Sequence, residues 1–427
     1  MDALTPYLEG FRALPKAPQH WLRALKEQSL QRAEARGFPG LRDEAWKYTS
    51  VAPLEKRSFK PASGTAKLDA AVLAAIAITG FKAHRAMFVN GRFDVTHSRL
   101  PTGVRAVPLD ALGAALHNLP ALPEIWQEDT FTDLNTALFQ DGLLLELDEG
   151  ARLDAPLELL HVSAPETVAS SHHLRCIVRL GPDSLATLVE RYVGLEGAKH
   201  LTNAVVQIDL AKRAQLTHVR LQEESTQGFH VGRVLVEQKE GSRYISHNLQ
   251  LGGAWSRLDI YTRLAETGAH AELYGLYAVD KRQHIDNHTR IDHAACGTVS
   301  RELYRGILDG QGRAVFNGKV LVVPHAVKTD AEQANHNLIL SRGAEIDTKP
   351  ELEIYADDVK CSHGATIGQL DEDQLFYLRS RGLSVDTARN LLIAAFAEKL
   401  LGALPHPALA AHARGRLGTS ITLPVQT

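Results

Sequence analysis

One stretch decides the fold class: residues 255–265 read WSRLDIYTRLA. Its side chains alternate between two sets, with Leu258, Ile260, Thr262 and Leu264 in one and Asp259, Tyr261 and Arg263 in the other. Because successive side chains of a β-strand point to opposite faces, this alternation predicts a strand with one buried face and one solvent-facing face. Residues 217–222 repeat the pattern, with His218, Arg220 and Gln222 expected on the solvent-facing side.

Short runs of this kind follow one another from about residue 140 to residue 368. Turns with small residues separate them at spacings near 27 to 31 residues, with one half-length step between Gly297 and Gly312. The turn glycines are Gly150, Gly181, Gly241, Gly268, Gly297, Gly312 and Gly343, and an Ala-Lys-Arg-Ala turn near Lys212 fills the gap between Gly181 and Gly241. A regular period with little residue identity predicts a β-solenoid, since each turn needs only an inward apolar strand and a tight corner. The alternative is a β-sandwich, which would be unusually large.

Helical patterns flank this β region. We expect three units: residues 1–139, mostly helical with a short mixed segment around an Asn90-Gly91 turn; a parallel β-helix core over residues 140–370; and a helical domain over residues 371–427. Asp371 is a candidate helix N-cap, and Gly382 suits the position after that helix. Ser384 or Asp386 is expected to cap the next one.

Composition indicates a folded cytoplasmic protein. The net charge is −3, and the 47 basic residues are scattered among 50 acidic ones, which argues against nucleic-acid binding and against an anionic membrane surface. The N-terminus lacks the pattern of a signal peptide, and no apolar run is long enough to span a membrane. Three widely separated cysteines fit neither a disulfide framework nor a closed zinc site.

Two stretches invite chemical interpretations that we do not favour. Residues 281–296, KRQHIDNHTRIDHAAC, contain His284, His288 and His293. Read with a period of two, they predict a solvated strand of mixed charges, and a transient metal site on that face is the alternative. Residues 312–320, GRAVFNGKV, have the wrong spacing for a phosphate-binding loop, so we interpret Asn317-Gly318 as a corner or hairpin turn.

The last β segment holds the best candidate ligands. Cys361 and His363, separated by one residue, project on the same side of a strand. A thiolate and an imidazole together suit a soft metal ion such as iron. Two ligands do not complete a site, so the others must come from another chain or a small molecule.

Three segments resemble the SufB/SufD family of the SUF iron–sulfur cluster assembly scaffold. They are residues 335–382, which match its C-terminal signature; residues 284–308, HIDNHTRIDHAACGTVSRELYRGIL, which match its second block; and residues 44–50, EAWKYTS, which match a short N-terminal motif typical of SufD-type members. Aligned with SufB-type members, this chain has Ile354 in place of a cysteine, and Ser362 and Gly364 in place of two glutamates. These departures indicate the SufD type and a helper role.

The resemblance implies a right-handed parallel β-helix with helical domains at both ends. It implies pairing of the last core strands with a SufB-type subunit, docking of a SufC-type ATPase on the C-terminal helices, and a homodimer when SufB is scarce. It assigns His363, assisted by Cys361, to iron or a nascent cluster at that interface, and it implies no enzymatic activity of the chain itself. Whether a flavin binds the complex stays open. The alternatives from other classes are a β-helix enzyme acting on polysaccharide and a purely structural solenoid in which Cys361 and His363 are inert.

Overall fold

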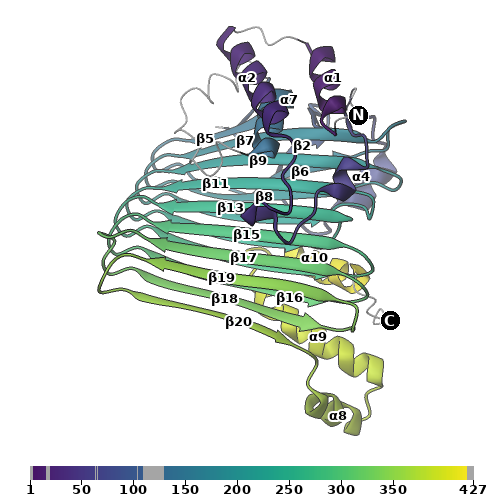
Figure 1. Cartoon of the computed structure of the whole chain (residues 1–427), viewed down its shortest axis with the longest axis vertical. Helices are drawn as coiled ribbons and strands as arrows, with labels where there is room; N and C mark the ends of the chain where they lie inside the picture. The colour runs from purple at the N-terminus through teal and green to yellow at the C-terminus, as the bar shows by residue number, and fades with distance from the viewer. Residues whose placement is uncertain are drawn as a thin grey trace.

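The computed structural model describes residues 3–15, 20–62, 64, 66–102, 104–108 and 129–420. Two ten-stranded sheets face each other as the walls of one long coil (Figure 1). The first sheet holds β1 (Lys60–Pro61), β4 (Val104–Pro108), β5 (Asp141–Leu147), β7 (Ser170–Leu180), β9 (His200–Leu210), β11 (Phe229–Gln238), β13 (Trp255–Leu264), β15 (His284–His293), β17 (Arg313–Val322) and β19 (Glu345–Ile354). The second holds β2 (His84–Val89), β3 (Arg92–Phe93), β6 (Leu157–Ser163), β8 (Leu185–Gly194), β10 (Gln215–Glu223), β12 (Arg243–Gln250), β14 (His270–Val279), β16 (Val299–Leu308), β18 (Asp330–Ile339) and β20 (Lys360–Gly368).

The chain alternates between the two sheets, so that each core strand pairs in parallel with the strand two positions later. The strands from β5 to β20 make about eight turns, which confirms the predicted parallel solenoid. The half-length step in the glycine spacing also has a cause. Gly150 and Gly297 lie in corners that lead from the first sheet to the second, whereas Gly312 and Gly343 lie in the opposite corners. The series of turn glycines therefore changes from one row of corners to the opposite row between Gly297 and Gly312.

Buried side chains fill the space between the two sheets. Their apolar part includes Val206, Leu216, Leu258 and Phe316. Gly318, which we had predicted to lie in a corner or hairpin turn, instead lies in the middle of β17, so that prediction is wrong.

The interior is polar over several turns, which the alternation pattern did not predict. His218, Arg220 and Gln222 were expected to face solvent, but all three are buried. They lie on the same side of β10 as the core residue Leu216, while the intervening Val219 and Leu221 belong to a second apolar cluster beneath the C-terminal helices. Both faces of β10 are therefore covered, and hydrophobicity alone assigned its inward face incorrectly.

Charges in this interior compensate each other. Arg220 Nη1 donates to Glu190 Oε2, and His218 Nδ1 lies 3.0 Å from the Tyr244 hydroxyl. Burial by itself would raise the pKa of Glu190, but Arg220 and His218 lower it to about 2. The carboxylate therefore stays ionised inside the solenoid because its partners are buried with it.

Buried histidines predict that the fold loses stability in mild acid. Burial lowers the pKa of His161 and His173 to about 3 and that of His293 to about 4. The folded state keeps these rings neutral, while the unfolded chain binds protons below about pH 6.5, so their contribution is complete above that pH and is lost as the pH falls towards 4. When the pH falls from 7 to 5.5, each of these rings lowers the free energy of unfolding by roughly 1 kcal/mol. Burial raises the pKa of Glu302 to about 7, so its protonation over the same pH range favours the folded state. This gain offsets the loss from about one histidine.

Urea unfolding at pH 7.0, 6.2 and 5.5 measures this effect. The expected net decrease in the free energy of unfolding is on the order of 2 kcal/mol. Most carboxylates other than Glu302 titrate below this window, so the net change reports mainly on the histidines. An unfolding free energy that stays constant over these three pH values would contradict the assignment of neutral interior rings.

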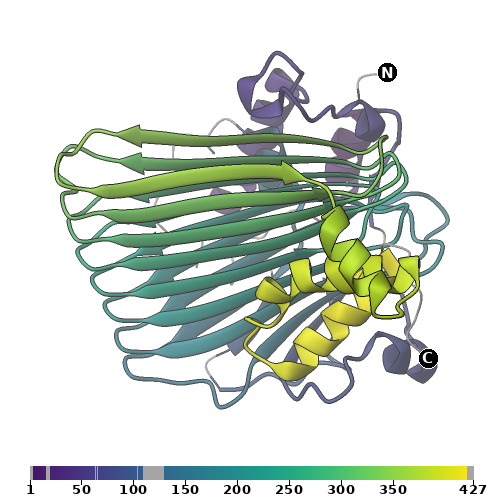
Figure 2. The same cartoon turned by 90° about the horizontal axis from the view of Figure 1, so that it is seen from below.

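Helices precede and follow the solenoid strands in the chain (Figures 1 and 2). The N-terminal helical elements are α1 (Thr5–Ala13), α2 (His20–Arg36), the 3-10 turn η1 (Glu44–Trp46), α3 (Ala52–Glu55), α4 (Ala70–Ile76) and α7 (Thr130–Leu138). The C-terminal ones are α8 (Glu372–Ser380), α9 (Val385–Leu401) and α10 (Pro407–Ser420). Every residue of α7 is buried, and α9 and α10 pack Leu400 and Leu417 against the outer face of the second sheet.

The predicted helix caps are confirmed. The Asp371 side chain accepts hydrogen bonds from the backbone N–H groups of Asp373 and Gln374, and Ser384 caps α9 by accepting from Thr387. Gly382 follows α8 with a φ of 92°, a conformation that favours glycine. None of the helices in the described ranges is long and apolar enough to cross a membrane.

Candidate metal centre at the open end of the solenoid

The solenoid ends in two unpaired strand edges, one on each wall. β19 is the last strand of the first sheet and β20 the last strand of the second. The N–H groups of Glu345 and Tyr355 donate inward to β17, so by alternation the N–H of Ile354 points to the open edge. Pro350 occupies another edge-facing position, where its missing N–H removes no bond from the ladder.

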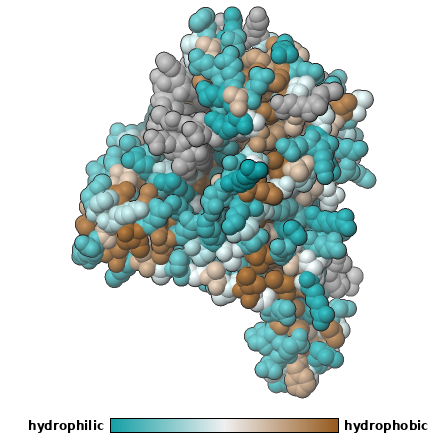
Figure 3. All heavy atoms as spheres, in the orientation of Figure 1, coloured by the Kyte–Doolittle hydropathy of each residue, from teal (hydrophilic) through white to brown (hydrophobic). Residues whose placement is uncertain are grey.

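The candidate ligands Cys361 and His363 lie on β20, which forms the second open edge. Because Lys360 N–H donates to Thr329 of the neighbouring region, the backbone groups of Cys361, His363 and Ala365 face the open edge. This end of the molecule is also apolar in places. Ile354, Tyr355 and Ile367 are exposed there, and Figure 3 shows brown atoms where the last strands run into α8.

Cys361 and His363 lie on one side of β20, as their spacing predicts. Cys361 is half-buried against an apolar cluster that includes Val320, Val322 and Ala331, and burial raises the pKa of its thiol. His363 is exposed. No set of three or more His, Cys, Asp or Glu side chains within the described residues is arranged to hold a metal ion. The pair alone therefore offers two soft ligands at an edge that is open to another chain.

The histidines of residues 281–296 do not join this pair. They lie on β15, five strands earlier in the chain, where His293 points into the solenoid and is held by Thr298 and Ser300. His288 binds Asp286 at 2.9 Å on the outer face. The prediction that this face is solvated is wrong for Asp286, which is completely buried. The pKa of Asp286 lies well below its usual range because His288 and Arg257 outweigh the effect of burial.

The N-terminal motif, residues 44–50, covers that face. Thr49 Oγ1 donates to Asp286 Oδ2 at 2.6 Å, and Arg257 Nη1 donates to the backbone oxygen of Ala45. Trp255 Nε1 donates to the backbone oxygen of Ser50, and Lys349 binds Glu44 at 2.9 Å. The N-terminal motif thus contacts both of the other segments that carried the family resemblance. No periodicity in the sequence predicts a contact across more than 200 residues.

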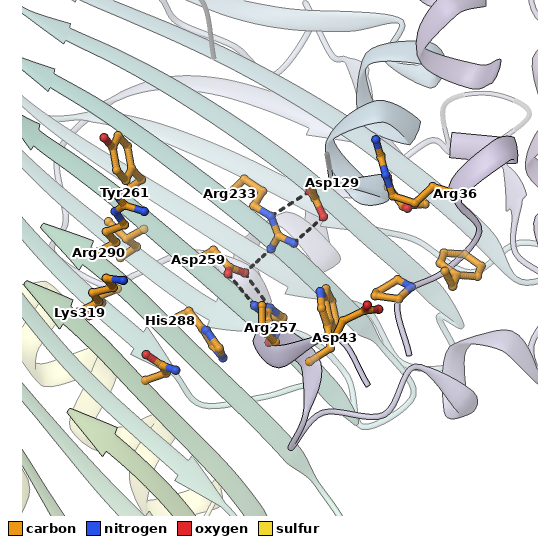
Figure 4. Close-up of a pocket in the computed structure, with 18 residues that line it drawn as sticks. Arg36, Asp43, Asp129, Arg233, Arg257, Asp259, Tyr261, His288, Arg290 and Lys319 are labelled. Atoms are coloured by element: carbon orange, nitrogen blue, oxygen red, sulfur yellow. Dashed lines mark hydrogen bonds and ion pairs between the residues drawn. The ribbon is translucent and has the colours of Figure 1, made fainter. Parts of the chain in front are cut away.

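A cleft of about 560 Å³ lies beside the motif, between the first sheet and residues 36–46. Arg233 bridges Asp129 and Asp259 there, and Arg257 binds Asp259 from the other side (Figure 4). Burial would lower the pKa of Arg257, but its carboxylate partners raise it above its usual range. Because these charges neutralise each other, the network attaches the N-terminal segment to the solenoid and presents no unpaired ligand set.

Comparison with known proteins gives a consistent result. Residues 162–396 match the family model described as "SUF system FeS cluster assembly, SufBD core domain", and residues 5–159 match "SufBD protein N-terminal region". The chain is 34% identical to the iron–sulfur cluster assembly protein SufD of Escherichia coli, over 96% of this chain and 93% of that protein. It is also 34% identical to an iron–sulfur cluster assembly SufBD family protein of Synechocystis, over 89% of this chain and 86% of the relative.

Proposed function

Because this chain belongs to the SufBD family of the SUF iron–sulfur cluster assembly system, we propose that it is a non-catalytic scaffold subunit that holds iron or a nascent cluster at an interface with a SufB-type partner. One observation carries this proposal. An incomplete pair of soft ligands, Cys361 and His363, lies on the strand whose free edge is open to another chain.

The partner adds its strands to the open edges. Unpaired backbone N–H and C=O groups of β19 and β20 invite a further strand, which gives main-chain hydrogen bonds across the interface. Without SufB, the same edges of two copies pair, which gives a homodimer. The right-handed winding implied by the resemblance, and a division into units at residues 139/140 and 370/371, belong to the same proposal.

Proline at position 354 tests the pairing. Ile354→Pro removes an edge-facing N–H at the end of β19, where no hydrogen bond within the solenoid is lost. We expect the dissociation constant of the heterodimer to rise about tenfold, since a lost backbone bond at an interface costs on the order of 1.4 kcal/mol. Ile354→Ala keeps the N–H and removes most of the side chain, so it is the matched control. Equal affinities for the two variants, both with unchanged circular dichroism, would refute pairing through this N–H.

The ATPase is expected to dock on the C-terminal helices through α8. In α9, Leu400 is buried and Phe396 packs against the core cluster beneath the helices, with Arg305 over its ring, so these residues serve internal packing. By contrast, Phe376 and Tyr377 of α8 are 73% and 57% exposed. Exposed aromatic side chains of this kind are enriched at interfaces.

The double variant Phe376→Ser/Tyr377→Ser tests this docking. Point changes are preferable to deletion of the helices, because α9 and α10 cover an apolar face of the solenoid. We expect the amount of ATPase co-purified with tagged chain to fall at least tenfold, as for the loss of hot-spot residues. Val168→Ser, an exposed apolar residue in the corner before β7, is the control. Undiminished co-purification would rule out α8 as the docking surface, and an absence of both ATPase and iron from wild-type preparations would favour the purely structural solenoid.

A further inference from the structure

Three polar side chains form a line inside the last turns of the solenoid. Glu302 on β16, Gln333 on β18 and His363 on β20 occupy equivalent positions in register on adjacent strands. All three lie on the side that faces into the coil, and backbones of neighbouring strands are about 4.8 Å apart. The line begins at a fully enclosed carboxyl group and ends at the exposed histidine of the candidate metal centre.

The amide of Gln333 is held in one orientation. Its Nε2 donates to Glu302 Oε2 at 2.7 Å, and both side chains are buried. On the opposite wall, a Cβ added to Gly318 would come within 2.2 Å of the same Nε2. The glycine in the middle of β17 therefore leaves the space that the amide occupies. In the structure the amide nitrogen faces Glu302, so the amide oxygen faces elsewhere.

That oxygen has no partner among the described residues. Gln333 Oε1 is buried and accepts no hydrogen bond. A buried acceptor without a donor costs on the order of 1–3 kcal/mol, so a donor that reaches this oxygen in another state of the molecule would stabilise that state. The next side chain in register along the line is His363 on β20, whose ring carries an N–H.

We propose that Gln333 is a positioning residue for His363: in the assembled complex its amide oxygen accepts a ring N–H of His363 and so directs the other ring nitrogen toward iron. A histidine that binds a metal ion through one nitrogen commonly donates the other N–H to a carbonyl or carboxylate oxygen, which fixes its tautomer and ring orientation. Gln333 provides that acceptor, and Glu302 and Gly318 hold it in place. The inference rests on the proposed role of His363 as an iron ligand.

Metal binding by the complex tests it, with Co²⁺ as a spectroscopic probe in place of Fe²⁺. The complex of this chain with its SufB-type partner and ATPase is titrated with Co²⁺, and visible absorption is followed. The variants are Gln333→Met, which removes the acceptor with little change in volume; His363→Ala; and the two combined. A fourth variant, Glu302→Gln/Gln333→Glu, exchanges amide and carboxylate, so it keeps both the bond within the line and an acceptor oxygen at position 333.

We expect Gln333→Met to weaken Co²⁺ binding about 10- to 100-fold and the exchange variant to restore it to within a few-fold. In the His363→Ala background, Gln333→Met should have no further effect. Size-exclusion chromatography and thermal unfolding check that each complex is assembled. Wild-type affinity in Gln333→Met alone would overturn the proposal while leaving His363 as a ligand. An equal loss in the His363→Ala background would also overturn it, because the role would then be structural. Unchanged affinity in His363→Ala would remove the iron role of His363, and this inference with it.

Discussion

Replacing His363 by alanine is expected to leave the complex assembled and active in ATP hydrolysis, while iron–sulfur enzymes fail to mature. The side chain is exposed in the free chain, and exposed substitutions of this kind usually change stability by no more than about 0.5 kcal/mol. The loss is therefore one of ligation and not of folding. Growth of a strain that lacks this subunit and depends on the pathway measures the effect, together with the visible absorption of the purified complex.

Companion variants sharpen the test. Asparagine at position 363 keeps polarity but binds iron poorly, so it should fail as alanine does. Cys361→Ala should matter less, because a partner cysteine can supply sulfur coordination. His336→Ala is the matched control: that ring lies on β18 at the same end of the solenoid but is bound to Thr366 at 2.8 Å. Full rescue by His363→Ala with normal cluster content would return Cys361 and His363 to ordinary packing.

The second large effect concerns stability. Arg220→Met is expected to lower the free energy of unfolding by about 3–5 kcal/mol, because it leaves the carboxylate of Glu190 buried without its main counter-charge. Urea unfolding at pH 7.5, where the buried histidines contribute fully, measures the change. Removal of one partner of an enclosed ion pair costs far more than the pair contributes when both are present.

Two controls test whether the loss of stability comes from burial of an unpaired charge. The double variant Glu190→Gln/Arg220→Met removes both charges and should recover most of the loss. Lys212→Met removes one partner of an ion pair with Glu240 in which both side chains are about half exposed, so it should cost less than 1 kcal/mol. A change below 1 kcal/mol for Arg220→Met itself would mean that water enters the interior at this position.

The sequence was most informative where the structure repeats. A strand shows in the alternation of 255–265, and the corners show as glycines because a tight corner is often built on a positive φ, as at Gly241 and Gly268. Helix caps depend on one side chain and its own backbone, so Asp371 and Ser384 were readable locally. These features need no knowledge of distant parts of the chain.

Two kinds of feature were not readable. The alternation at 217–222 identifies two faces but does not say which of them points inward, and the buried partners of Arg220 come from another strand. Likewise, Asn317-Gly318 has the composition of a turn, but the glycine is required by an amide that reaches across from the opposite wall. Such requirements are set by neighbours about 15 to 30 residues away, and a single sequence does not pair them.

The candidate centre was partly predictable. The spacing of Cys361 and His363 fixes their common side of a strand, whereas the open edges and the line from Glu302 through Gln333 depend on where the solenoid stops. The two residues alone suggested a metal ion such as iron and further ligands from another chain or a small molecule. The identity of the partner as a SufB-type subunit came only from the resemblance to a family.

The contacts of residues 44–50 constrain the order in which the chain folds during its synthesis. Thr49 binds a residue 237 positions later in the chain, and Glu44 binds one 305 positions later. At about 5–20 residues per second, the ribosome needs roughly 15–60 s to reach Lys349 after Glu44. During that time the turns of the solenoid can form one upon another as they emerge, and Ala45 and Ser50 can contact β13, but the partners of Thr49 and Glu44 are still missing. A nascent chain interrupted before β15 therefore lacks the contacts of Thr49 and Glu44, which distinguishes it from a finished one.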